Sequence, residues 1–265
     1  KIISAGAAGV ELARLKFSAT NEAVDLKQVA FQLSSVASNT PTDLVGRQIT
    51  LWDADTNTQI GTAVFPTADN ATSSAIASGA FRIPANGSKT MIIKGDIAAI
   101  NVAGPLTNSG DLLVVDYDGN NVTGTNGTYG SGVSSNTNVA PTNTDTASNG
   151  VRIMKAYPTV AWVDIPTHTL AAGSNKVLYR FKVTATNGDV ALYKTNFTIG
   201  SSTISATSTT YGLYAYTDAG FSTVDTTFSA TGILNSGNKF NGGQSTQPTG
   251  NLTIYPAKTN YATTT

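Results

Sequence analysis

The chain repeats a stretch of its own sequence. Residues 14–33 align without a gap on residues 180–199, an offset of 166. Self-similarity at a fixed period marks tandem copies of one structural unit, so we expect two related domains. Eight aligned pairs are identical: Arg14/Arg180, Lys16/Lys182, Ala19/Ala185, Thr20/Thr186, Asn21/Asn187, Val24/Val190, Leu26/Leu192 and Phe31/Phe197.

Each copy begins with the pattern of a β-strand. In the first copy, apolar residues at Leu15, Phe17 and Ala19 alternate with polar ones. The second copy does the same from Val177 to Ala185. A period of two residues is typical of a strand with one buried face.

The phase of this alternation then changes. The next apolar set begins on Val24 and Leu26 but ends on Phe31 and Leu33, which have the opposite parity. The second copy changes phase in the same way between residues 192 and 197. One extra residue in a strand moves the buried set to the other parity, so we predict a β-bulge near Lys27–Gln28 and another near Tyr193–Lys194.

Further strands are predicted downstream. We expect them at residues 48–54, 59–66, 78–84, 89–98, 111–117 and 151–164, with Pro158 placing the last at a sheet edge or at the start of its strand. Short strands separated by regular turns predict an all-β fold of two tandem Ig-like β-sandwich domains, residues 1–150 and 151–265. Residues 119–150 carry few apolar side chains and are expected to form a long, flexible polar loop.

Both copies of the repeat look incomplete. Subtracting 166 from the strand at 151–164 gives positions before residue 1, so the first copy lacks that strand. The second copy ends before a clear counterpart of residues 88–94 or 111–116. A sandwich that lacks a strand has an open edge, and we expect either a longer protein or neighbouring subunits to supply the missing strands.

Composition excludes several classes of function. With 16 Lys and Arg against 16 Asp and Glu, the chain lacks the excess positive charge of a nucleic-acid or anionic-membrane surface. With no Cys and one His, His168, it has no thiol nucleophile, disulfide framework or His cluster for zinc. No apolar run approaches the length of a membrane span.

Two turns have the spacing of oxygen ligands for calcium. Asp53, Asp55 and Asn57 alternate like the start of a calcium loop, although the central Gly and closing Glu are absent. Asp116, Asp118 and Asn120 are similar. The alternative in both cases is a hairpin turn, in which Asx side chains cap the backbone.

Other chemistry has weaker signals. The paired carboxylates lie two residues apart in turns, which does not suit the separated acid and nucleophile of a glycosidase. Trp52, Trp162 and the tyrosines could stack on sugars, but aromatic residues in strands more often form cross-strand pairs. We therefore predict no catalytic residues and no cofactor other than calcium.

Several strand phrases resemble a known kind of module. Residues 15–22 (LKFSATNE), 29–33 (VAFQL), 49–53 (ITLWD), 89–96 (KTMIIKGD) and 155–160 (KAYPTV) are similar to the repeated Ig-like β-sandwich modules of bacterial cell-surface proteins, especially the large surface-layer-like proteins of candidate-phylum bacteria. The resemblance implies a secreted protein that acts as a coat, stalk, adhesin or filament subunit, and it supplies no catalytic residues.

These observations favour a structural role outside the cell. We expect a subunit of a filament joined head to tail by strand sharing, or of a surface layer, whose partners are copies of itself. The alternative is an adhesin or a module that binds a cell-surface glycan.

Overall fold

The computed structural model describes the protein at residues 1–34, 37–66, 68–100, 108–120, 127–141, 144–169, 171, 173, 176–192, 195–199, 212–234, 240–241 and 250–254. Within these residues the chain is all-β, and its one helical element is a single 3-10 turn, η1 (Pro41–Asp43). No helix in this part of the chain is long and apolar enough to cross a membrane.

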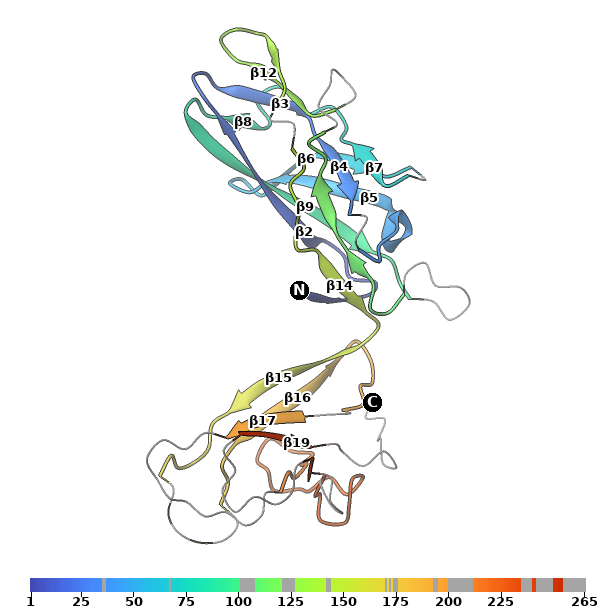
Figure 1. Cartoon of the computed structure of the whole chain (residues 1–265), viewed down its shortest axis with the longest axis vertical. Coiled ribbons are helices and arrows are strands. Elements are labelled where there is room, and N and C mark those ends of the chain that lie inside the picture. Colours follow the sequence, from blue (N-terminus) through green and yellow to red (C-terminus); the bar gives the residue numbers. More distant parts are fainter. Residues whose placement is uncertain are drawn as a thin grey trace. The chain divides into compact units, whose positions relative to one another are not determined.

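The chain divides into two compact units, Lys1–Lys155 and Ala156–Thr265 (Figure 1). The largest sheet of unit 1 has four antiparallel strands in the order β2 (Val10–Ala19), β9 (Gly87–Ile97), β5 (Leu44–Asp53) and β6 (Thr58–Val64). The predicted alternation on β2 is confirmed, because Leu15 and Ala19 are buried whereas Arg14, Lys16 and Ser18 are exposed.

The described part of unit 1 contains three smaller sheets as well. Their strand orders are β1 (Ile2–Ser4), β14 (Val151–Met154) and β10 (Leu112–Leu113); β11 (Val115–Tyr117), β4 (Ala30–Leu33) and β7 (Asn70–Thr72); and β13 (Asn138–Val139), β12 (Tyr129–Gly132), β3 (Val24–Gln28) and β8 (Arg82–Ile83). Side chains from these sheets and from the largest sheet share one buried cluster, which includes Leu51, Ile93, Phe31, Leu113 and Ile153. Several sheets around one core are consistent with a β-sandwich.

The predicted bulge in the first copy is confirmed. In the pairing of β3 with β12, Gln28 lies opposite Tyr129 and Leu26 lies opposite Gly130, so Lys27 is the extra residue. The chain then passes through Val29 from β3 into β4, which belongs to a different sheet. Leu26, Val29 and Phe31 are all at most 3% exposed, so the bulge lets both strands face the same core. The second predicted bulge, at Tyr193–Lys194, lies outside the described residues.

The other predicted strands of unit 1 are present with shifted bounds. Residues 48–54, 59–66 and 89–98 correspond to β5, β6 and β9. Residues 111–117 form two short strands, β10 and β11, on either side of Val114. The prediction at 78–84 is wrong except for β8, because the backbone turns at Ala77–Ala80 and Gly79 adopts a φ of +80°.

The loop interpretation of residues 119–150 is wrong for β12 and β13. β12 pairs with both β3 and β13, and Thr128 before it is fully buried. Glycine explains the missing apolar signal: a Cβ added to Gly130 would lie 2.5 Å from Val24 Cγ1. The strands approach too closely for a side chain at this position.

The strand predicted at 151–164 is two strands in different units. β14 pairs in parallel with β1 and belongs to the core of unit 1, where Val151 and Ile153 are buried. β15 (Tyr157–Val163) belongs to unit 2. The units therefore meet at Lys155–Ala156, beyond the expected boundary at residues 150–151.

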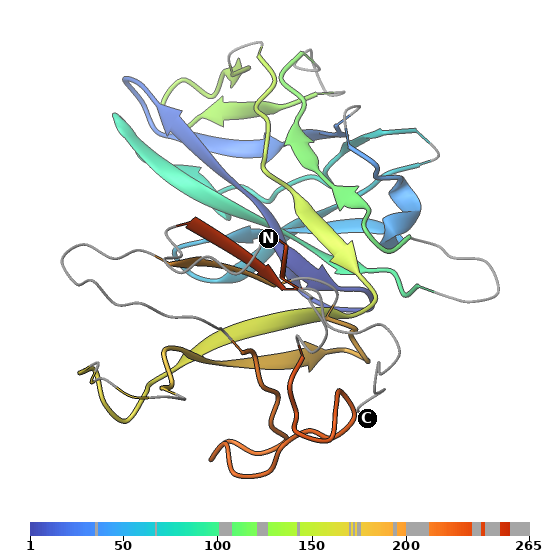
Figure 2. The ribbon, with the colours of Figure 1, turned by 60° about the horizontal axis from the view of Figure 1, so that its bottom comes forward.

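The described residues of unit 2 form two sheets. β15 pairs with β16 (Arg180–Thr186) along its whole length, and Figure 2 shows these two strands side by side as a ribbon. Pro158 is the second residue of β15, at the edge of this sheet, as predicted. The second sheet has the order β17 (Thr195–Ile199), β19 (Gly250–Ile254) and β18 (Phe240–Asn241).

Candidate functional site

The turn that carries Asp53, Asp55 and Asn57 joins β5 to β6. Asp53 is buried, and its Oδ1 accepts a hydrogen bond of 3.0 Å from the Asp55 N–H, which begins the turn. Its Oδ2 lies 2.8 Å from Lys89 Nζ on β9. Asp55 and Asn57 are exposed, and Asn57 adopts a φ of +51° at the end of the turn.

The environment of Asp53 stabilises its charged form. Burial raises the pKa of its carboxyl group, but hydrogen bonds from Lys89 and from the Asp55 N–H outweigh burial, so the pKa lies below its usual value. Because both carboxylate oxygens already have protein donors, the turn offers a cation mainly the exposed Asp55 and Asn57. The geometry supports the alternative of a hairpin turn capped by Asx side chains.

Asp116 and Asp118 lie at β11 and just beyond it, and both are buried. Asp116 Oδ1 accepts a hydrogen bond of 2.7 Å from the Ser148 N–H, and Asp118 Oδ2 accepts one of 3.0 Å from Asn70 Nδ2. Asn120 is exposed, and its N–H donates to Asp145. Asp116 therefore holds the segment at residues 146–148, which lies beside β11, and Asp118 holds β7.

Asp145 is a residue that sequence analysis missed. Its Oδ1 accepts hydrogen bonds from the Gly119 and Asn120 N–H groups at 2.8 and 3.2 Å. Its Oδ2 accepts one of 3.0 Å from Gln32 Nε2 on β4. The hydrogen bond from Gln32 contributes most to lowering the pKa of Asp145. The sequence signal was a lone aspartate in a stretch interpreted as a loop, and its partners are 25 to 113 residues away.

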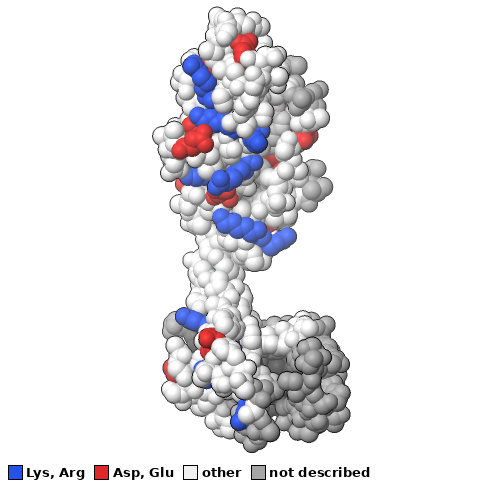
Figure 3. Space-filling view, turned by 90° about the vertical axis from the view of Figure 1, so that its left-hand side faces the viewer, with Lys and Arg blue, Asp and Glu red and all other residues white. Residues whose placement is uncertain are grey.

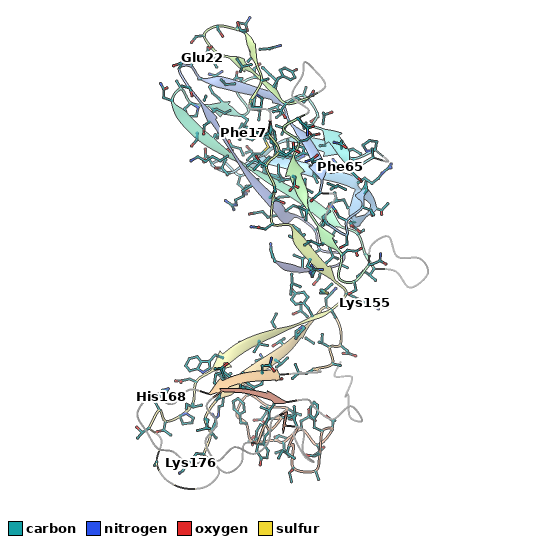
Figure 4. All side chains as sticks on the ribbon, viewed as in Figure 1. Phe17, Glu22, Phe65, Lys155, His168 and Lys176 are labelled. Carbon is teal, nitrogen blue, oxygen red and sulfur yellow. The ribbon has the colours of Figure 1, made fainter. Side chains whose placement is uncertain are left out.

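Other acidic side chains also serve turns. Glu22 accepts hydrogen bonds from the Ser134 and Ser135 N–H groups, at 2.8 and 3.0 Å, and so fastens the loop after β12 (Figure 4). Exposed His168 lies 2.8 Å from Asp164, also exposed. Within the described residues, no three His, Asp or Glu side chains gather in a group that could hold a metal ion. The calcium sites stay predictions.

The surface of unit 1 offers an open strand edge. β2 is the terminal strand of the largest sheet, and no described strand pairs with its outer side. Its solvent face carries Arg14, Lys16 and Ser18, and Figure 3 shows Lys and Arg side chains in a series over unit 1, interspersed with Asp and Glu. An unpaired edge presents free N–H and C=O groups to any extended chain.

The surface of unit 2 exposes large apolar side chains. On β15, Val160 is 63% exposed and Trp162 is 61% exposed. The neighbouring strand β16 exposes Val183, and the segment before it exposes Val177, Leu178 and Tyr179. An exposed cluster of this kind is typical of an interaction surface rather than of a monomer surface.

Comparison with known proteins gives no match to this chain. No protein-family model matches the chain, and no curated protein matches it. The resemblance to surface modules therefore stays a prediction from strand phrases.

Proposed function

We propose that this chain is a non-enzymatic structural subunit of an extracellular assembly, built from two tandem Ig-like modules and joined to copies of itself by strand sharing. A filament joined head to tail is the form we favour, and a surface layer is the other form of the same role. The observation that carries this proposal is the open edge of β2 together with the exposed Val160 and Trp162 on β15. Pairing of these two elements would satisfy both. The edge strand would gain hydrogen-bond partners for its backbone, and the exposed apolar side chains of β15 would be buried.

The organisation of the polar groups supports a structural role. Asp53, Asp116 and Asp145 each accept hydrogen bonds from turns or from a neighbouring segment of backbone. The carboxylates therefore serve to hold long connections in a chain that has no disulfide. Such connections suit a subunit whose task is to keep its shape.

Electron microscopy and light scattering test this proposal. We expect the purified chain to form fibres or a lattice as its concentration rises, with a mean mass that grows accordingly. A monodisperse monomer over the whole accessible concentration range would overturn it.

The second candidate is a glycan-binding surface module. The observation that favours it is the exposure of Trp162, Tyr179 and Tyr214, at 61%, 53% and 48%, since flat exposed rings can stack on sugar faces. A glycan array should then give specific hits that Trp162→Ala removes and that Tyr216→Ala, on a different segment, retains. An array without specific hits would rule against this role.

A further inference from the structure

The backbone groups that β2 leaves unpaired can be identified. The Ala54 N–H donates to the Thr90 carbonyl at 3.1 Å, so Thr90 on β9 directs its backbone groups toward β5. In an antiparallel sheet successive residues alternate sides, so Lys89 and Met91 direct theirs toward β2. Their partners there are Phe17 and Leu15. The backbone groups of Arg14, Lys16 and Ser18 therefore point outward, to the side on which no described strand pairs with β2.

In unit 2, the strand that corresponds to β2 has a partner on the side that is open in β2. β16 aligns with residues 14–20 of β2 at the offset of 166, with Thr184 equivalent to Ser18. Thr159 Oγ1 on β15 donates to the Thr184 carbonyl at 3.3 Å, so that carbonyl faces β15. β15 thus occupies the side of β16 that corresponds to the open side of β2.

We propose that the open edge of β2 binds the segment Tyr157–Val163 of a second copy of the chain, antiparallel and in the register that β15 has on β16. This inference rests on the proposed assembly by strand sharing, and it names the acceptor, the donor and their register. Subtracting 166 from the β16 partners places Thr159 opposite Ser18, Val160 opposite Phe17 and Ala161 opposite Lys16. Trp162 falls opposite Leu15 by the same arithmetic.

The side chains suit this register. Residues directly opposite each other in an antiparallel pair share a face, so Val160 and Trp162 would lie beside Phe17 and Leu15 on the core side of β2. Phe17 lies only partly buried at the border of the core, with its ring edge-on to Phe81 and Tyr117 (Figure 4). On the solvent face, Lys16 and Arg14 would lie opposite Ala161 and Val163, which are uncharged and so do not repel them.

Pro158 selects which side of β15 is used. Thr159 faces β16, so Pro158 directs its nitrogen, which has no hydrogen, to the opposite side of β15. That side is interrupted by the proline and makes a poor ladder. The side of β15 that binds β16 has an uninterrupted row of backbone donors and acceptors. On assembly, β15 would therefore leave β16 and pair through this same side with β2 of a second copy. A two-stranded ribbon is marginal on its own, which favours the exchange for a four-stranded sheet over a core.

A labelled peptide tests the acceptor edge in the full-length chain. We use residues 156–164 as a fluorescent peptide and measure binding by anisotropy. The variant Ser18→Pro removes the outward N–H, whereas Ser18→Ala keeps it. We expect Ser18→Ala to bind as the unmodified chain does and Ser18→Pro to bind about tenfold more weakly. Equal binding by both variants, or no binding to the unmodified chain, would overturn the proposal. Thermal unfolding of each variant verifies that the proline leaves unit 1 folded.

Cross-linking tests the register without the proline. The chain has no Cys, so Lys16→Cys in one copy and Ala161→Cys in another can be joined by a short bismaleimide without background. We expect cross-linked dimers from this mixture and few from Leu15→Cys with Ala161→Cys, since a slip of one residue moves the thiol to the other face. Preference for the slipped pair, or no cross-linked dimer from either mixture, would overturn the proposal.

The two proposals can fail separately. If micrographs show polymers that Ser18→Pro leaves intact, the assembly stands and this acceptor edge is wrong. If the peptide binds in register but the chain stays monomeric at every concentration, the edge stands as a strand acceptor, while self-assembly and the second copy as donor are wrong.

Discussion

Lys89 Nζ lies 2.8 Å from Asp53 Oδ2 and so joins the middle of the largest sheet to the turn that leaves β5. The side chains are 16% and 3% exposed, so water screens this pair poorly. The same carboxylate begins the turn to β6 through the Asp55 N–H. One buried group therefore supports both a strand pair and a hairpin.

Replacing this carboxylate should destabilise unit 1. Asp53→Asn leaves the Lys89 ammonium without its counter-charge, and we expect the free energy of unfolding to fall by about 2 kcal/mol. Denaturant unfolding followed by circular dichroism measures the change. The control Asp55→Asn alters an exposed neighbour and should remain within about 0.5 kcal/mol of the unmodified chain. An equal loss in both variants would contradict the role of the pair.

The same pair predicts a dependence on acid. The pKa of Asp53 is lowered in the folded protein from its ordinary 3.8, so its contribution is complete above that value and is lost as pH falls through the lower folded pKa. The difference in unfolding free energy between the unmodified chain and Asp53→Asn should therefore shrink below pH 3.8 and stay constant between pH 5 and 7, about one unit or more above that value. A difference that grows on acidification would refute this assignment.

Deleting Lys27 should be far more damaging than trimming it. Without the extra residue, the apolar sets of β3 and β4 cannot both face the core, and we expect a loss of about 4 kcal/mol or more, or no cooperative unfolding at all. Lys27→Ala keeps the bulge and should cost within about 0.5 kcal/mol. Thermal scans of both variants decide the matter. A deletion variant that melts like Lys27→Ala would show that the bulge does not set the register.

In unit 2, Asp218 should titrate unusually low. The N–H groups of Thr223 and Ser222 donate to its carboxylate and lower its pKa from 3.8 to about 2. The folded turn at residues 218–223 should thus keep its hydrogen bonds down to that pH, and its contribution to stability is lost between 3.8 and about 2. Nuclear magnetic resonance of the two amides follows this change directly. Midpoints near the ordinary value, or the same midpoints in Asp218→Asn, would contradict the prediction.

Trp162 should matter for assembly but not for folding. Its side chain is 61% exposed, so Trp162→Ala should change the free energy of unfolding of the monomer by less than about 0.5 kcal/mol. Assembly followed by light scattering should decrease clearly, because the ring would be buried between copies. The control Tyr214→Ala removes an exposed ring elsewhere in unit 2 and should assemble normally. A large loss of monomer stability would mean that Trp162 already packs within its own unit.

Local patterns predicted much of unit 1. The parity change between Leu26 and Phe31 was visible because each apolar side chain lies on one face of a strand, and the extra residue is Lys27. The strand at 129–132 was invisible for the opposite reason. Its inward positions are Gly130 and Gly132, which carry no side chain for a pattern to detect. Burial there comes from close backbone approach, which hydrophobic periodicity does not record.

The polar network was harder to foresee than the strands. The spacing of Asp53 and Asp55 correctly predicted a tight turn, but the partner on β9, Lys89, is separated from Asp53 by 36 residues of sequence. Asp145 takes its donors from residues 119, 120 and 32, which only the folded chain brings together. Contacts between residues far apart in the sequence produce no short motif. The sequence therefore could not indicate which carboxylates bind backbone segments in the folded chain.

The parallel pairing of β1 with β14 has a mechanical consequence. Ile2, Ile3 and Ser4 lie opposite Arg152, Ile153 and Met154, with both strands running in the same direction. A pull on Lys1 and Lys155 draws the two strands along each other, so their hydrogen bonds are loaded in shear and must yield together. An antiparallel pair pulled at adjacent ends would open one bond at a time. Unit 1 should therefore resist stretching along this axis with a force out of proportion to the length of its shortest strands, which suits a link in a load-bearing chain.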